Sequence, residues 1–285
     1  MEEISTIAVL GAGTMGRGIA HVSALAGYAT RLYDTDGAAL ERARAAIHRN
    51  LDKGVELKKV GAGEAEQAKR LLELRASLPE AVAGAGLVIE AVPEVVNLKI
   101  ETFREAAVHA PQDAIFASNT SALSITEMAA ASGRPQRFAG MHFFNPVPVM
   151  KLVEVVETIA TSPETRETVV EFAKALGKEP IRTRDNSGFI VNRLLVPYLL
   201  DAVRALEEGV GTKEDIDRGM ELGCGYPMGP LKLLDFVGLD TTYAIAEIMF
   251  DEYREKRFAP PPLLKRMVLA GRYGRKSGRG FYEYA

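Results

Sequence analysis

The sequence predicts an α/β fold, in which a doubly wound sheet is followed by an all-helical C-terminal domain. Up to about residue 183, short apolar and β-branched runs alternate with helix-length segments, which is typical of βαβ units. After Gly188 this alternation stops, and apolar residues recur only at helical spacing. We therefore place a boundary near Asn186 and expect domains at residues 1–186 and 187–285.

The first domain is expected to alternate strands and helices along its length. The predicted strands span residues 4–10, 29–33, 87–92, 114–117, 137–144, 152–156 and 180–183. The predicted helices span residues 15–26, 36–51, 64–73 and 98–108, and one more begins at residue 163. Gly27 should end the first helix and Asp36 should cap the second, because these residue types are favoured at those positions.

The second domain is expected to contain helices at residues 189–208, 212–221, 231–253 and 262–270. Pro197 lies inside the first of these and should kink it, since proline removes a backbone hydrogen bond. Thr212 is a favourable cap for the second. These helices are richer in Leu, Val, Ile and Met than a thin helical layer needs, so we expect a homodimer that buries the surplus.

The composition argues against several classes of protein. The formal net charge of -3 gives no basic excess, so we expect no nucleic-acid partner. No apolar run approaches the ~18 residues that a membrane span needs, and the acidic N-terminus is unlike a signal peptide. Cys224 is the single cysteine, and the histidines lack metal-ligand spacing, so we expect neither a disulfide nor a metal. A cytoplasmic location is the default expectation.

A glycine-rich turn follows the first predicted strand and opens the first helix. It consists of Gly11, Ala12, Gly13, Thr14, Met15 and Gly16. Within a βαβ unit, the first glycine permits a tight turn, the second lets a pyrophosphate approach, and the third allows close helix–strand packing. The helix N-terminus offers free N–H groups to the phosphates. The sequence therefore predicts a Rossmann-type domain that binds a dinucleotide.

An acidic residue ends the second predicted strand. Asp34 lies eighteen residues after Gly16, where a carboxylate can accept hydrogen bonds from the ribose hydroxyls of NAD. The same carboxylate would repel the 2′-phosphate of NADP. We therefore expect the cofactor to be NAD.

Two polar segments lie at the carboxyl ends of predicted strands, where ligands bind in open α/β sheets. One is residues 118–121, with the sequence SNTS, and the other is residues 140–146, with the sequence GMHFFNP. His142 in the second segment suits general-base work on an alcohol, because an imidazole takes up a proton near neutral pH. On its own, a hydrogen-bonded core histidine would be the more common interpretation.

Ordered motifs along nearly the whole chain resemble one enzyme family. They are GAGTMG, IEAVPE, ASNTS, GMHFFNP, KLVEVV, NRLL, YPMGP and GRKSGRGFY. The resemblance is to the L-3-hydroxyacyl-CoA dehydrogenases, and among them to the bacterial 3-hydroxybutyryl-CoA dehydrogenases. It implies NAD-dependent oxidation of a short-chain 3-hydroxyacyl-CoA and the reverse reaction, with the dimer interface in the helical domain.

The resemblance also implies roles for individual residues. His142 would be the catalytic base, Glu154 would orient it, and Ser121 and Asn192 would contact the reacting oxygen. Without the resemblance, Ser121 reads as a turn or helix cap and Asn192 as a surface amide. Residues expected to contact the dinucleotide are Glu94, Lys99, Asn119, Asn145 and Lys276.

Two further positions concern the substrate. Lys53 would lie near the CoA moiety, whose phosphates need a cation. Many relatives read NTSS where this chain reads NTSA, so Ala122 departs from the family pattern. Ser121 is kept, and the departure therefore bears on local substrate contacts rather than on the chemistry.

Two alternatives remain from the sequence. A dehydrogenase of a free small 3-hydroxy acid has a similar build, but such enzymes usually use a lysine base, and His142 with Glu154 argues against it. A non-catalytic redox sensor would bind NADH without turning over acetoacetyl-CoA. Activity therefore distinguishes these possibilities.

Overall fold

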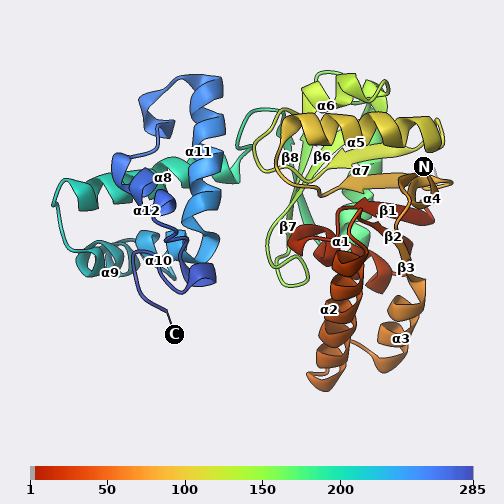
Figure 1. The fold of residues 1–285 in the computed structure, drawn as a ribbon, viewed down its shortest axis with the longest axis horizontal. Helices are drawn as coiled ribbons and strands as arrows, with labels where there is room; N and C mark the ends of the chain where they lie inside the picture. Colours follow the sequence, from red (N-terminus) through yellow and green to blue (C-terminus); the bar gives the residue numbers. More distant parts are fainter. Residues whose placement is uncertain (1–3, 285) are drawn as a thin grey trace. The chain divides into compact units, whose positions relative to one another are not determined.

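The computed structural model describes residues 4–284, and the chain divides into two compact units, Met1–Asp185 and Asn186–Ala285. The first unit is α/β and the second is helical, which confirms the predicted fold class (Figure 1). None of the helices described is both long and apolar enough to cross a lipid bilayer.

An eight-stranded sheet forms the centre of the first unit, in the order β3-β2-β1-β4-β5-β6-β7-β8. The strands are β1 Thr6–Leu10, β2 Ala29–Tyr33, β3 Leu72–Arg75, β4 Leu87–Glu90, β5 Ile115–Ser118, β6 Phe138–Phe143, β7 Leu152–Glu157 and β8 Glu179–Arg184. Neighbouring strands pair in parallel except β6 and β7, which are antiparallel. The strand order reverses between β1 and β4, and such a switch point is where ligands bind in sheets of this kind.

Helices cover both faces of this sheet (Figure 1). They are α1 Thr14–Leu25, α2 Gly37–Glu56, α3 Ala62–Leu71, α4 Leu78–Val82, α5 Val96–His109, α6 Ile125–Ala131 and α7 Pro163–Ala175. One core joins α1, α2, α3 and α7 to alternate strand residues such as Val9 and Ile89. On α5, Phe103 stacks against Phe116 of β5 and meets Phe138 of β6 edge to face. Burial on both faces explains why these strands read as continuous apolar runs.

Three elements of the first unit differ from the sequence prediction. The helix expected at residues 64–73 ends at Leu71, and the next four residues form β3. β3 is an edge strand that pairs only with β2. Its sequence LELR consists of Leu, Glu and Arg, which all favour helices, so the sequence alone predicts a helix here. The short helices α4 and α6 were not predicted, because each is too short for helical periodicity to be seen.

The second unit consists mainly of helices. They are α8 Val191–Glu207, α9 Lys213–Cys224, α10 Pro230–Val237, α11 Leu239–Tyr253 and α12 Pro262–Leu269. The single helix predicted at residues 231–253 is wrong, because Gly238 with φ +108° separates α10 from α11. Pro197 lies within α8, and Thr212 caps α9 by accepting a hydrogen bond from the Asp215 N–H.

Candidate active site

Strands β6 and β7 bring the candidate base and its acidic partner together. His142 on β6 lies directly opposite Glu154 on β7 in the antiparallel ladder. Directly opposed residues project from the same face of a sheet, so the register alone makes the two side chains neighbours. Glu154 is fully buried, whereas Val153 and Val155, which flank it along β7, project from the opposite face of the sheet.

The two side chains form a buried hydrogen bond. His142 Nδ1 lies 2.7 Å from Glu154 Oε2, and the residues are 5% and 0% exposed. A carboxylate can only accept, so Nδ1 carries the proton and donates it to Glu154. This fixes the tautomer in which Nε2 presents its lone pair. A buried carboxylate at this distance would also stabilise the imidazolium once Nε2 takes up a proton.

A serine hydroxyl lies on the other side of the ring. Ser121 Oγ is 3.1 Å from His142 Nε2, and Ser121 belongs to the turn that follows β5. With Nδ1 donating to Glu154, Ser121 Oγ donates to Nε2. The lone pair and the hydroxyl therefore mark one small volume in which an alcohol oxygen could contact both groups.

Glu94 ties the Ser121 turn to a neighbouring loop. Glu94 Oε1 accepts hydrogen bonds from the Ser121 N–H, at 2.9 Å, and from the Thr120 hydroxyl. Its other oxygen pairs with Lys99 Nζ at 3.2 Å, and Lys99 also pairs with the fully buried Glu90 at 2.6 Å. Burial raises the pKa of Glu90, while the charge of Lys99 opposes that rise. Glu94 and Lys99 thus belong to a hydrogen-bonded network that reaches Ser121.

Asn119 and Asn145 lie at the two ends of this region. Asn119 Oδ1 accepts a hydrogen bond of 2.9 Å from the Phe143 N–H, which joins the turn after β5 to β6. Asn145 follows β6 and is exposed, and its bond to Pro146 is cis. Asn119 thus directly follows β5, and Asn145 lies two residues after the end of β6. In the sequence, Asn119 is close to Ser121 and Asn145 is close to His142.

The glycine-rich turn fits a dinucleotide. Gly11 has φ +106°, which a side chain would strain, and a Cβ on Gly16 would lie 1.7 Å from the Gly11 carbonyl oxygen. A Cβ on Gly13 would meet nothing within 4 Å, so this residue leaves open space in front of α1. Gly13 caps α1 without a side-chain hydrogen bond, and the first N–H groups of the helix therefore face that space. Ala12, Thr14 and Met15 complete the turn and the start of α1.

Asp34 stands beside this turn at the end of β2. Its Oδ2 accepts a hydrogen bond of 2.7 Å from the Ala12 N–H, and its Oδ1 accepts one of 2.9 Å from the Asp36 N–H. These bonds hold a carboxylate where the ribose of a dinucleotide on this turn would lie. The residues present therefore fit NAD.

Three further sequence candidates remain: Lys53 belongs to the first unit, and Asn192 and Lys276 belong to the second. Lys53 is exposed in the last turn of α2. Asn192 is half-buried near the start of α8, and Lys276 pairs with Asp240 at 2.7 Å. Sequence reasoning missed Glu90, although a charged residue closing the apolar run LVIE was a visible signal.

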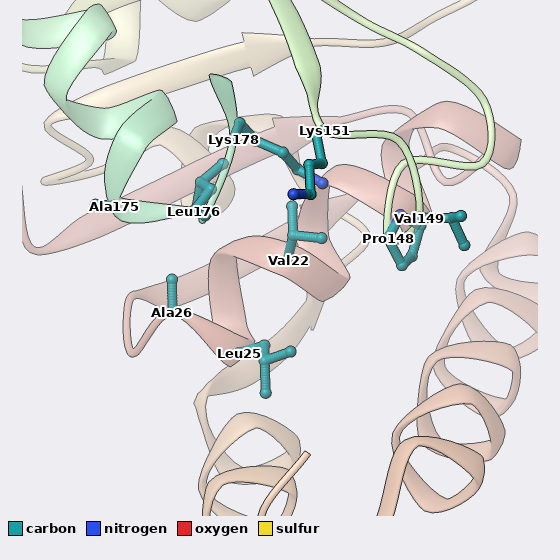
Figure 2. A pocket seen from close by; sticks show the side chains of 10 residues that line it. Val22, Leu25, Ala26, Pro148, Val149, Lys151, Ala175, Leu176 and Lys178 are labelled. Atoms are coloured by element: carbon teal, nitrogen blue, oxygen red, sulfur yellow. The ribbon is translucent and has the colours of Figure 1, made fainter. Parts of the chain in front are cut away.

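A separate cavity of about 410 Å³ lies elsewhere in the first unit (Figure 2). The side chains around it come from the second half of α1, the end of α7 and the loop after β6, and none is a candidate site residue. The buried Lys178 donates to the carbonyl oxygens of Val147 and Met150, at 2.5 and 2.9 Å. Burial lowers the pKa of Lys178. Its contacts mark it as an anchor for that loop.

No group of three or more His, Cys, Asp or Glu side chains within residues 4–284 is placed to hold a metal ion.

Two family models match the chain in succession. Residues 6–186 match the NAD binding domain of 3-hydroxyacyl-CoA dehydrogenase, and residues 188–284 match the C-terminal domain of the same enzyme. The chain belongs to the 3-hydroxyacyl-CoA dehydrogenase family. This confirms the family that the sequence motifs indicated, and it assigns an NAD-binding domain to the first unit.

Individual relatives of this family match along the whole chain. The 3-hydroxybutyryl-CoA dehydrogenase of Mycobacterium tuberculosis is 47% identical, over 99% of both chains. The mitochondrial hydroxyacyl-coenzyme A dehydrogenase of Homo sapiens is 46% identical, over 99% of this chain and 91% of its own. The crystal structure of (S)-3-hydroxybutyryl-CoA dehydrogenase from Ralstonia eutropha is 40% identical, with a TM-score of 0.94 over 99% of this chain and all of that one.

Proposed function

We propose that this protein is an NAD-dependent dehydrogenase that interconverts 3-hydroxyacyl-CoA and 3-ketoacyl-CoA. The substrate would be a short-chain thioester such as 3-hydroxybutanoyl-CoA, the type named for two of the relatives above. The observation that carries the proposal is the buried His142–Glu154 pair, with Ser121 Oγ at hydrogen-bond distance from Nε2 of the same imidazole. Family membership supports the substrate class, and this geometry is what a general base acting on an alcohol would need.

His142 is the proton acceptor in this proposal. During oxidation Nε2 removes the proton from the 3-hydroxyl, and the electron pair left on oxygen forms the carbonyl. NAD, which the glycine-rich turn and Asp34 would hold, would supply the acceptor for the hydride that leaves C3. In the reverse direction the imidazolium of His142 returns its proton to the oxygen, and Glu154 balances the positive charge of the ring while Nε2 holds that proton.

Ser121 and Asn192 would hold the reacting oxygen. Ser121 Oγ lies at hydrogen-bond distance from Nε2, so an oxygen that contacts the base can contact this hydroxyl too. Asn192 would supply a second contact from α8. Two donors at a developing carbonyl or alkoxide oxygen stabilise charge as it moves, and this lowers the barrier in both directions.

The remaining candidate residues would bind the cofactor or the substrate. The turn from Gly11 to Gly16 would receive the pyrophosphate and Asp34 the adenine ribose. Further contacts to the dinucleotide are proposed for Glu94, Lys99, Asn119, Asn145 and Lys276. Lys53 would meet the phosphates of CoA, which the exposed position of its side chain permits.

A homodimer is the proposed assembly, and the cytoplasm is the proposed location. Several apolar side chains of the helical unit lie exposed to solvent, among them Leu194, Leu222 and Leu269 at 71%, 68% and 77%. Exposed apolar surface of this kind is commonly covered by a second subunit.

A steady-state assay tests the proposed activity. Acetoacetyl-CoA and longer 3-ketoacyl-CoA thioesters would be supplied with NADH, alongside free acetoacetate and a set with NADPH. We expect turnover of the thioesters with NADH and little or none of the free acid. Turnover of free acetoacetate at equal efficiency would favour the small-acid dehydrogenase. NADH binding without turnover of any 3-ketoacyl substrate would favour the sensor.

A further inference from the structure

A buried carboxylate that this mechanism does not use lies at the end of β4. Glu90 is 0% exposed and is paired in register with Ser118, the last residue of β5. Its Oε1 accepts from Lys99 Nζ at 2.6 Å and from the Val92 N–H at 2.7 Å, while Oε2 accepts from Ser118 Oγ at 2.6 Å. A charge this deep is costly unless it is paired, so its neighbours are held tightly in return.

Two hydrogen-bonded routes lead from Glu90 toward the candidate base. In the first, Lys99 bridges Glu90 to Glu94, and Glu94 Oε1 accepts from the Ser121 N–H at 2.9 Å. In the second, Ser118 Oγ accepts from the Thr120 N–H at 3.3 Å, and the Thr120 hydroxyl donates to Glu94. Both routes lead to residues 120–121, and Ser121 Oγ belongs to this turn.

We propose that Glu90 is a positioning residue for the reaction. It holds Lys99 and Ser118, these fix Glu94 and the Ser121 turn, and the turn keeps Ser121 Oγ 3.1 Å from His142 Nε2. Glu90 itself does not touch the reacting atoms. Small displacements of positioned groups are expensive in catalysis, and a misplacement of about 1 Å can cost ~10² in rate. The inference rests on the proposed function, because it assigns the network a task in that reaction.

A purely structural role for the Glu90–Lys99 pair makes a different prediction. A pair that only stabilises the fold would lower stability when broken, and any loss of rate would be independent of Ser121. A pair that acts through Ser121 would matter only while the Ser121 hydroxyl is present. A double-mutant cycle between the two positions separates these cases.

The experiment compares Glu90→Gln, Ser121→Ala and the double variant. Glutamine keeps the shape of Glu90 but removes its charge, and kcat and KM for acetoacetyl-CoA would be measured at saturating NADH. We expect Glu90→Gln to lower kcat ~10–10²-fold and to change KM by less than about threefold. In the Ser121→Ala background the same change should lower kcat by less than about threefold. Losses that multiply across the two positions would overturn the proposal.

Two controls keep the result interpretable. Asp217→Asn removes an equally buried carboxylate from the helical unit, and it should lower stability in urea while kcat stays within about twofold of wild type. If Glu90→Gln does not fold, Ser118→Ala removes only the hydroxyl that donates to Glu90 Oε2, and the same cycle applies with a smaller loss. If the wild-type enzyme is active and the losses of the two single variants multiply in the double variant, the positioning role is rejected while the proposed function stands. A wild-type enzyme that leaves acetoacetyl-CoA unreduced rejects the proposed function, and the inference with it.

Discussion

His142 and Glu154 lie directly opposite one another on antiparallel strands, and their side chains meet with Nδ1 2.7 Å from Oε2. The only antiparallel pair among the described strands of the sheet is therefore the one that joins the candidate base to its carboxylate. A slip of one residue would send Glu154 to the opposite face, so the register of the sheet fixes the contact. Sites built on strands are held more rigidly than sites on loops, which suits a proton acceptor.

The first prediction concerns this pair of residues. Replacing His142 by Gln keeps a similar volume but removes the group that titrates, and we expect kcat to fall ~10²–10⁴-fold. NADH affinity should stay nearly unchanged, because the glycine-rich turn and Asp34 lie on other strands of the sheet. Glu154→Gln should lower kcat as well, since the imidazolium loses its charge partner. Steady-state kinetics and NADH fluorescence titration measure the two effects.

The combined His142 and Glu154 variant provides a sharper check. Residues that act as one unit give losses that do not multiply, so the double variant should be little slower than His142→Gln alone. His109→Gln on the exposed end of α5 is a matched control and should retain wild-type kcat. Near-normal turnover by His142→Gln would remove the base from the mechanism.

The second prediction concerns the choice between NADH and NADPH. Asp34 presents a carboxylate at the end of β2, so kcat/KM should strongly favour NADH. Asp34→Ala should reduce the ratio of the two kcat/KM values at least about tenfold, because hydrogen bonds to charged groups contribute ~1.5–3 kcal/mol. Asp36→Asn, which keeps the cap of α2, should leave the ratio unchanged. Equal kcat/KM values for the two cofactors in the wild-type enzyme would contradict this interpretation.

The third prediction concerns the glycines of the turn. A Cβ at Gly16 would lie 1.7 Å from a backbone oxygen, so Gly16→Ala must displace the turn and should lower both stability and NADH affinity. A Cβ at Gly13 meets no protein atom within 4 Å, so Gly13→Ala should fold normally yet bind NADH at least about tenfold more weakly, since it fills the approach to the pyrophosphate. Gly63→Ala on α3 is the control. Calorimetric NADH titration would contradict the interpretation if Gly13→Ala bound as tightly as wild type.

Much of the fold follows from local sequence signals. The run from Thr6 to Leu10, the glycine turn and the strand ending at Tyr33 have apolar patterns and punctuation that need no tertiary contacts to be recognised. The strand β3 could not be found in this way, because LELR becomes a strand only by pairing with the edge of β2. Gly238 was overlooked because a glycine within a long apolar run is compatible with a continuous helix until its φ is known.

Some residues of the candidate site could likewise be grouped from the sequence, and others could not. The motifs grouped His142, Glu154 and Ser121, whose side chains lie in contact, while their roles in turnover stay predictions. The network from Glu90 through Lys99 depends on the register of β4 against β5 and on the path of the following loop. Such contacts depend on the tertiary structure, and no spacing of residues in the sequence predicts them.

The fourth prediction concerns the C-terminal segment. Asp235 on α10 is 1% exposed and accepts from the Phe281 and Tyr282 N–H groups, both at 2.8 Å, and from the Tyr284 hydroxyl at 2.9 Å. Asp235→Ala would leave one buried and one partly buried backbone donor without this acceptor and should cost about 3 kcal/mol in the free energy of unfolding. Tyr284→Phe removes one of the three bonds and should cost about 1 kcal/mol. Urea denaturation measures both, and equal losses for the two variants would contradict the carboxylate's part in holding the backbone.

The last prediction concerns His21 on α1 and the dependence of stability on pH. This side chain is 5% exposed, its Nδ1 has no hydrogen-bond partner within the described structure, and burial, followed by the charge of Lys178, lowers its pKa from 6.5 to about 4. Below pH 6.5 the unfolded chain binds a proton that the folded chain does not. The contribution of His21 is therefore fully present above pH 6.5 and is lost as the pH falls toward 4, for a total of about 3 kcal/mol.

Urea denaturation at pH 7.5 and pH 5.0 isolates this contribution. Between these values the wild-type protein should lose about 2 kcal/mol through His21, and His21→Leu should lose about that much less, because leucine does not titrate. Other groups that titrate in this range act on both proteins equally, so the difference between the two losses reports on His21. His109→Leu, on an exposed histidine, should keep the wild-type dependence. Identical losses for wild type and His21→Leu would mean that His21 takes up its proton as readily in the folded chain as in the unfolded one, and that its burial on α1 carries no pH-dependent cost.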